Sequence, residues 1–174
     1  MPYPAARALL LLILANSLPW VLGRLLRGRW AARIDLGLTL ADGRPLLGSH
    51  KTWRGLAAAV CGCAGAAVLL RLPWWTGAEF AAISLFGDAL SSLCKRRLGV
   101  APGSSMLLLD QLPEAVLPLI ALRSSLELGA MAIAAVAGVF TLLDVLVTTI
   151  RRRAIESRAA CGAPPAGDPA DDLR

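Results

Sequence analysis

The stretch AEFAAISLFGDALSSLCKRR, residues 78–97, joins a long apolar run to a cluster of cations and carries one acid inside the run. The apolar part, about 78–94, predicts a membrane-spanning helix. Asp88, Ser92 and Lys95 recur at helical spacing and therefore share one face. An acid within a membrane-length segment is costly and commonly faces a polar cavity and a ligand. The stretch predicts a charged site at a membrane edge, and the alternative is an Asp that pairs with a cation only to fix helix packing.

Four other apolar runs predict further spans. They cover about 8–22, 56–72, 106–122 and 126–150, and each approaches the roughly 20 residues that cross a bilayer. A cleaved signal peptide is the alternative for the first run, but the basic residues gather after it, which favours a retained span. The chain of 174 residues is 56% hydrophobic, with a mean hydropathy of +0.62. We therefore expect an all-α polytopic membrane helix bundle of about five transmembrane helices with a cytoplasmic polar cavity.

The basic residues predict the orientation of this bundle. With the N-terminus outside, only Arg7, Arg71 and Arg123 of the 18 Lys and Arg residues lie outside the cell. Because cytoplasmic loops carry the excess of positive charge, we expect a multi-pass protein of the cell membrane with a cytoplasmic C-terminus. Such apolarity at a net charge of +6 does not fit a soluble nucleic-acid binder. Residues 1–153 are expected to form a single transmembrane domain, and the Ala-, Pro- and Gly-rich residues 154–174 a disordered cytoplasmic tail.

A second cluster of polar residues, GSHKTWRG over residues 48–55, precedes the second run. Lys51, Thr52 and Arg54 stand there at the start of a predicted helix. A helix N-terminus with cationic side chains binds anions such as phosphate. The alternative is that Lys51 and Arg54 only anchor the helix among lipid headgroups, and charge alone does not decide between the two.

A third polar element begins at Asp110. Asp110 and Glu114 lie four residues apart and share a face if the segment is helical. Together with Asp88 they are candidates to bind Mg²⁺, a hard cation that prefers carboxylates and also binds phosphate oxygens. Lys95 and Arg96 are candidates to neutralise those phosphate oxygens. The alternative for the acids is hydration and a favourable interaction with the helix dipole.

The four cysteines predict neither a disulfide framework nor a zinc site. Cys61 and Cys63 lie two apart in an apolar helix and point in different directions, while Cys94 and Cys161 are isolated. The chain has one histidine, too few for a typical zinc ligand set with these spacings.

In their order along the chain, these motifs resemble the CDP-archaeol synthase family, integral membrane cytidylyltransferases similar to the phosphatidate cytidylyltransferases. The resemblance covers about 35–115, and the motifs are DGR at 42–44, GSHKTWRG at 48–55, GD at 87–88, SLCKRRLG at 92–99 and LDQ at 109–111. Two departures from the related enzymes are present: Pro113 stands where they often carry a second acid, and Glu114 lies beside it. Ser49-His50 also replaces an acidic residue and a glycine that archaeal members commonly have.

The resemblance implies a reaction, in which a lipid phosphate attacks the α-phosphate of CTP to give a CDP-lipid and pyrophosphate with Mg²⁺ as cofactor. By this similarity the catalytic candidates are Asp88, Lys95 and Asp110. The metal candidates are Asp88, Asp110 and Glu114, and the substrate-binding candidates are Lys51, Thr52, Arg54, Ser92 and Arg96. The expected partners are CTP, a membrane lipid phosphate and the bilayer; a homodimer is left open and nucleic acid is not expected. The alternative class is a small membrane transporter or lipid-binding subunit, although no inverted repeat is visible.

Overall fold

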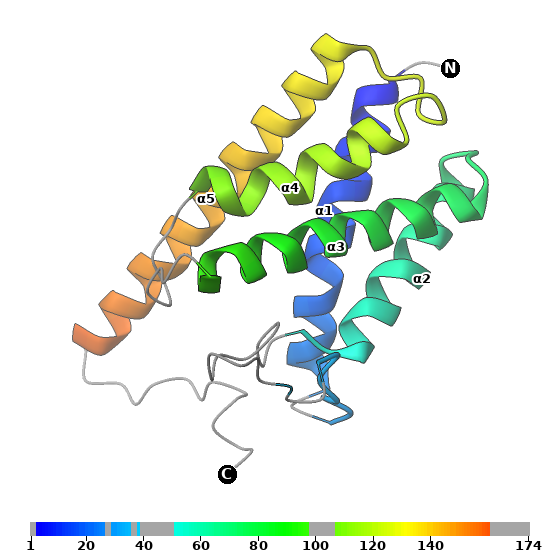
Figure 1. The fold of residues 1–174 in the computed structure, drawn as a ribbon. Coiled ribbons are helices and arrows are strands. Elements are labelled where there is room, and N and C mark those ends of the chain that lie inside the picture. The colour runs from blue at the N-terminus through cyan, green and yellow to red at the C-terminus, as the bar shows by residue number, and fades with distance from the viewer. Residues whose placement is uncertain (1–2, 27–28, 36–37, 39–50, 98–106, 161–174) are drawn as a thin grey trace.

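The computed structural model describes residues 3–26, 29–35, 38, 51–97 and 107–160. Within these residues the chain is all-α, as the apolar runs predicted, with five helices that follow one another along the sequence (Figure 1). Their bounds are α1 Pro4–Leu25, α2 Trp53–Leu69, α3 Trp74–Arg97, α4 Leu107–Ala121 and α5 Ala130–Ala160. We call the end of the bundle at which α1 and α3 end and α2 and α4 begin the loop end.

Local signals explain where the helices begin and end. α1 starts at Pro4, whose fixed φ suits a first helical position, and carries the cation Arg24 in its last turn. Thr52 caps α2, because its hydroxyl accepts a hydrogen bond from the Gly55 backbone N–H at 3.3 Å. α2 ends in a Schellman motif: Arg71 adopts φ 59° and the Leu72 N–H donates to the Ala67 carbonyl at 2.8 Å.

α3 is the central helix of the bundle and packs most extensively against α2 and α4. The core of the described residues holds fully buried side chains from α1, α2, α3 and α4, among them Leu11, Cys63, Phe80 and Leu119. Among the described residues, α5 packs mainly against α1 and α4 and lies beside them (Figure 1). α3 is therefore held from two sides, whereas α5 is attached more loosely.

Two glycines of α3 allow its close contacts. A Cβ at Gly77 would lie 2.6 Å from the Cys63 carbonyl carbon of α2, and a Cβ at Gly87 would lie 2.6 Å from the Pro113 carbonyl carbon of α4. Both neighbours are backbone atoms, which cannot move aside as a side chain can. Small residues that bring helix backbones together are typical of membrane bundles. The Gly87 contact also fixes the position of α4 relative to Asp88.

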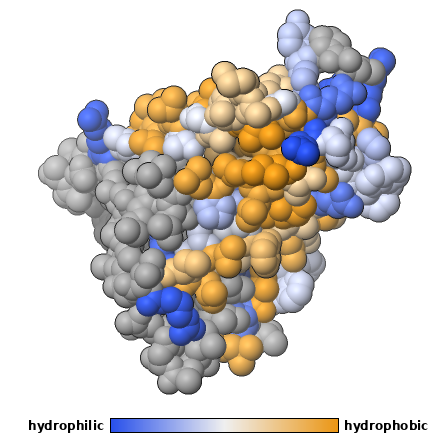
Figure 2. All heavy atoms as spheres, turned by 45° about the horizontal axis from the view of Figure 1, so that its top comes forward, coloured by the Kyte–Doolittle hydropathy of each residue, from blue (hydrophilic) through white to orange (hydrophobic). Residues whose placement is uncertain are grey.

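The outer surface of the bundle is largely apolar. Figure 2 shows hydrophobic side chains across the middle of one face, with hydrophilic residues toward its rims. Among the described residues, two helical segments are long and apolar enough to cross a membrane, Pro4–Leu25 and Ala130–Ile150. Large apolar side chains of α5 are exposed, including Leu142, Leu146 and Ile150. A surface of this kind suits lipid better than water.

The structure corrects one expectation. α5 continues to Ala160, so the prediction of a disordered tail from residue 154 is wrong as far as residue 160, while 161–174 lie outside the described residues. The reason is that the Ala-, Arg- and Glu-rich stretch after Ile150 is favourable for a helix. Pro113 and Pro118 lie inside one continuous helix, α4. Cys61, Cys63 and Cys94 are free thiols, as predicted, and Cys161 is outside the described part.

Candidate active site

An ion pair between Lys51 and Asp88 forms the centre of the candidate site. Lys51 Nζ donates to Asp88 Oδ2, and the two side chains are 20% and 30% exposed. The pair joins residues 37 positions apart, one just before α2 and one in the middle of α3. Sequence reasoning selected both residues but placed them in separate motifs. The structure brings them into direct contact, in a partly buried setting where an unpaired charge is costly.

A short antiparallel contact positions Lys51. The Ile34 N–H donates to the Lys51 carbonyl at 2.9 Å, and the Trp53 N–H donates to the Ala32 carbonyl at 3.0 Å. These bonds frame a β-bridge between Arg33 and Thr52. The segment before α2 is thus tied to the chain that follows α1, as expected for a folded loop. Lys51 is held by its own backbone beside the first turn of α2.

Arg54 takes a different position from Lys51. Its guanidinium donates to the Arg29 carbonyl and lies 3.6 Å from where a Cβ on Gly23 would stand, so it contacts the end of α1. Its Nε is buried and has no hydrogen-bond partner among the described residues. Buried donors normally find a partner, so this N–H is a candidate to bind an anion. No described contact links Arg54 to Asp88.

The packing of α3 on α4 determines which turn of α3 lies beside the third motif, which begins at Asp110. Gly87 lies against Pro113, and the Ser84 hydroxyl donates to the Glu114 carbonyl at 3.1 Å, so the two helices run antiparallel. Asp110 precedes Pro113 by one turn toward the loop end, about 4.5 Å along the helix axis. Its backbone therefore lies at the level of the α3 turn between Asp88 and Ser92. The spacing of the sequence left open whether this motif reaches Asp88, and tertiary packing places the two backbones side by side.

The other predicted site residues are brought together only in part. Ser92 and Lys95 follow Asp88 on one continuous helix and are half-buried. The side chains of Arg96, Asp110 and the GSH part of the second motif lie outside the described part of the structure. Within the described part, no three His, Cys, Asp or Glu side chains are grouped to bind a metal ion. In the described part, Asp88 is thus a single carboxylate at the candidate site. The backbone of Asp110 lies beside it on the neighbouring helix, α4.

Sequence reasoning did not single out two acids that the structure makes notable. Asp35 is only 4% exposed, and it follows the residue that bonds to the Lys51 backbone. Asp144 lies in the apolar helix α5. Each makes an interaction with a neighbour. The sequence feature that could have identified Asp144 is the one used for Asp88, an acid within a membrane-length apolar run. For Asp35, nothing in the local sequence indicated that its side chain is buried.

Fold and site together define an all-α membrane protein with a paired acid and base toward the loop end of its helices. The sequence matches the family described as CarS-like CDP-archaeol synthase over residues 8–73 and 75–154, and the chain belongs to this family. The resemblance inferred from the motifs is thereby confirmed.

Curated relatives and a solved structure agree with this assignment. The CDP-archaeol synthase of Thermofilum pendens is 35% identical over 119 residues, which are 64% of this chain and 58% of the relative. That of Aeropyrum pernix is 39% identical over 108 residues, 58% of each chain. A solved structure described as an intramembrane enzyme for archaeal membrane lipids biosynthesis superposes with a TM-score of 0.68 at 30% identity, covering 83% of this chain and 92% of that one. The chain spans less than two thirds of the length of the curated relatives.

Proposed function

We propose that this protein transfers a cytidylyl group from CTP to the phosphate of a membrane lipid, giving a CDP-lipid and pyrophosphate. The observation that carries the proposal is the Lys51–Asp88 ion pair, which joins two of the family-like motifs in one partly buried place. An acid and a base side by side at a membrane edge suit a substrate that brings phosphates and a cation together. The names of the relatives support the same reaction class.

In the proposed reaction, an oxygen of the lipid phosphate attacks the α-phosphorus of CTP. A new P–O bond forms, the bond to the β-phosphate breaks, and pyrophosphate leaves with its electron pair. Transfers of this kind need little covalent participation from the protein, so the residues act by positioning and charge neutralisation. Lys51 and Lys95 neutralise phosphate oxygens from two elements, and the buried Arg54 Nε offers a further donor.

Asp88 and Asp110 would hold the Mg²⁺ that the family resemblance implies, with Glu114 as a third candidate. The donor set fits in part: a carboxylate oxygen is the ligand type that Mg²⁺ prefers, and a single carboxylate leaves positions for phosphate oxygens and water. Bound there, the ion would offset the negative charge of the phosphates. The Lys51 ammonium already lies at the Asp88 carboxylate and is therefore within reach of phosphates bound beside it.

We also propose that all five helices span the cell membrane with the N-terminus outside. The asymmetry of the basic residues supports this orientation, which puts the loop end in the cytoplasm, where CTP is available. Single cysteines for thiol labelling, placed near Trp75 and Arg123 at the other end of the bundle, should react from outside in intact cells. Labelling of these positions only after lysis would reverse the orientation.

The test of the activity is the formation of CDP-lipid from labelled CTP by the purified protein in detergent with Mg²⁺. An isoprenoid ether lipid phosphate and a diacyl lipid phosphate are offered separately, because the lipid class is open. Asp88→Asn keeps the size of the side chain but removes its charge, and should lower the rate about 10²-fold or more. The matched control is Glu79→Gln, which removes an exposed carboxylate near the other end of the same helix and should leave the rate unchanged.

Two results would contradict the proposal. The first is the absence of CTP-dependent product with both lipids in a folded preparation. The second is a normal rate for Asp88→Asn, which would return Asp88 to a role in helix packing.

A further inference from the structure

The Lys51–Asp88 ion pair places a cation of the chain itself on the carboxylate that is the metal candidate. Lys51 Nζ donates to Asp88 Oδ2, and both side chains are partly buried. An ammonium on one oxygen of a carboxylate repels a cation on the other oxygen, because only a few ångströms separate the two charges. The carboxylate thus accepts a positive charge, as a metal ligand must, but it already has one.

The backbones on both sides of the pair are held in place. The Ile34 N–H donates to the Lys51 carbonyl at 2.9 Å, and the Ser91 hydroxyl donates to the Asp88 carbonyl at 2.9 Å within α3. Neither bond involves the two charged groups. The Lys51 ammonium, in contrast, lies at the end of a flexible four-carbon stem. The pair can therefore open by rotation of the Lys51 side chain, without a movement of the helices.

Opening the pair is costly unless the ammonium finds another anion. A partly buried charge loses stabilisation when its partner is removed, because water does not fully replace that partner. CTP, the proposed substrate, supplies new partners, since its phosphates are anions that a lysine binds as a compact charge. The same phosphates bring oxygen ligands for a divalent cation. All charges are thus compensated when the cation and the nucleotide bind together, but not when the cation binds alone.

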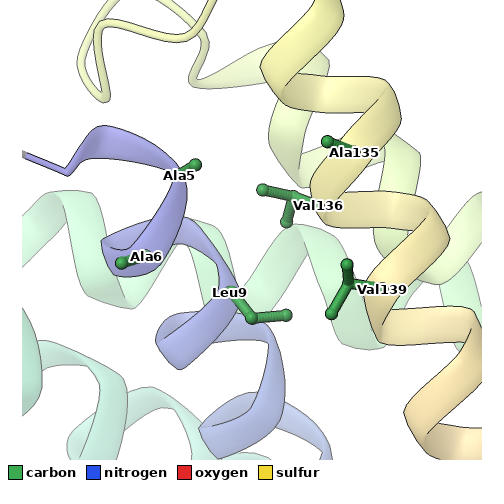
Figure 3. A pocket seen from close by; sticks show the side chains of 6 residues that line it. All are labelled: Ala5, Ala6, Leu9, Ala135, Val136 and Val139. Atoms are coloured by element: carbon green, nitrogen blue, oxygen red, sulfur yellow. The ribbon is translucent and has the colours of Figure 1, made fainter.

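The apolar pocket between α1 and α5 offers no route to this pair. It has a volume of about 160 Å³ and is lined by Ala5, Ala6, Leu9, Ala135, Val136 and Val139 (Figure 3). These side chains carry no oxygen or nitrogen that could accompany an ion. The pocket lies at the start of α1, whereas the Lys51 segment is bonded to the chain that follows the end of this helix. An ion or a nucleotide reaches the pair from the loop end, where the pair is partly exposed.

We propose that Lys51 competes with the divalent cation for Asp88, so that the cation binds tightly only together with CTP. This inference rests on the proposed function and adds a control on how its site is filled. Without substrate, Lys51 neutralises Asp88; with CTP bound, the ammonium passes to the phosphates and leaves the carboxylate to the cation. By linkage, CTP increases the affinity for the cation by the same factor by which the cation increases the affinity for CTP.

The direct test measures the binding of Mn²⁺, which takes the same oxygen ligands as Mg²⁺, to the purified protein in detergent without CTP or lipid. The paramagnetic resonance signal of free Mn²⁺ gives the affinity. Lys51→Gln removes the charge and keeps a polar side chain, so we expect it to bind Mn²⁺ about 10-fold more tightly than the wild-type protein. Lys51→Arg keeps the charge and can donate two parallel hydrogen bonds to a carboxylate, so we expect it to bind Mn²⁺ more weakly than the wild-type protein.

Two controls locate the effect at Asp88. Arg24→Gln also removes one positive charge from the loop end, but the Arg24 guanidinium lies over the Trp20 ring of α1, 5.4 Å from its centroid. This variant should bind Mn²⁺ as the wild-type protein does. In Lys51→Gln combined with Asp88→Asn, the gain in affinity should disappear because the carboxylate is gone. Thermal unfolding shows which variants are folded, and if Lys51→Gln is not, the comparison of Lys51→Arg with the wild-type protein decides.

Three results would overturn the inference. The first is equal Mn²⁺ affinity of the wild-type protein and the folded Lys51 variants. The second is a gain in Lys51→Gln that persists after Asp88→Asn, since the ion would then bind elsewhere. The third is an equal gain in Arg24→Gln, which would make the effect one of net charge at the loop end.

A second measurement compares the affinity for CTP with and without Mg²⁺. Addition of Mg²⁺ should increase this affinity about 10-fold more in the wild-type protein than in Lys51→Gln, because only the wild-type protein has an ammonium to transfer to the phosphates. The complex of Mg²⁺ with CTP in solution is the same for both proteins and cancels in the comparison. An equal increase would contradict the transfer of Lys51.

These binding measurements do not depend on turnover, so the two proposals can fail separately. A protein that shows the predicted order of Mn²⁺ affinities but makes no CDP-lipid would contradict the proposed function alone. A protein that makes CDP-lipid without this order would contradict the role of Lys51 alone.

Discussion

Replacement of Gly87 by Ala tests whether close packing of α3 on α4 sets the geometry of the site. The new Cβ would lie 2.6 Å from the Pro113 carbonyl carbon, whereas ordinary contacts begin at 3.4 Å. The Pro113 carbonyl oxygen lies closer still, so the two helices must separate locally by about 1 Å, since backbone atoms on α4 cannot rotate away. Overpacking of this kind costs about 1–3 kcal/mol, offset by about 1 kcal/mol from the better helix propensity of Ala.

The larger effect is expected on the rate. Asp88 is the next residue of α3, so it shifts relative to α4 by a similar amount. A misplacement of about 1 Å can lower a rate about 10²-fold. The assay is CDP-lipid formation from labelled CTP, together with thermal unfolding in detergent. Gly65→Ala on α2 is the control, because a Cβ there meets open space and no loss is expected. If Gly87→Ala is as active as Gly65→Ala, the contact with Pro113 does not position the site.

Two further variants separate folding from chemistry. Thr52→Ala removes the hydroxyl that caps α2 and should lower the free energy of unfolding by about 1 kcal/mol. Thr52→Ser keeps the hydroxyl and should keep the stability. If the two variants unfold at the same temperature, the Thr52 hydroxyl does not stabilise α2 as a cap. Lys95→Arg keeps the positive charge but replaces a compact ammonium by a planar guanidinium, so we expect normal unfolding with most CTP-dependent turnover lost. Unchanged turnover would make Lys95 a simple membrane-edge anchor.

The sequence predicted the helical class and the five helices because these depend on local patterns. Apolar runs and the Thr52 cap both act within a few residues. The end of α5 was predicted too early, also for a local reason: the Ala-, Pro- and Gly-rich composition of residues 154–174 indicated disorder, although the Ala, Arg and Glu residues up to 160 are good helix formers. The contact between Gly87 of α3 and Pro113 of α4 had no local signal, since glycines also occur at helix positions that meet open space, as at Gly65.

The sequence by itself determined that acids and bases belong to one edge of an apolar bundle, because charged side chains are costly within a membrane and collect where polar surroundings exist. Only the tertiary structure decided which of them meet. Lys51 reaches Asp88 across 37 residues because the segment before α2 is bonded to the chain after α1. Asp110 comes to the level of Asp88 because Gly87 lets α4 approach α3. Contacts of such sequence separation depend on how helices pack, and packing is a property of surfaces that are complete only when the chain has folded.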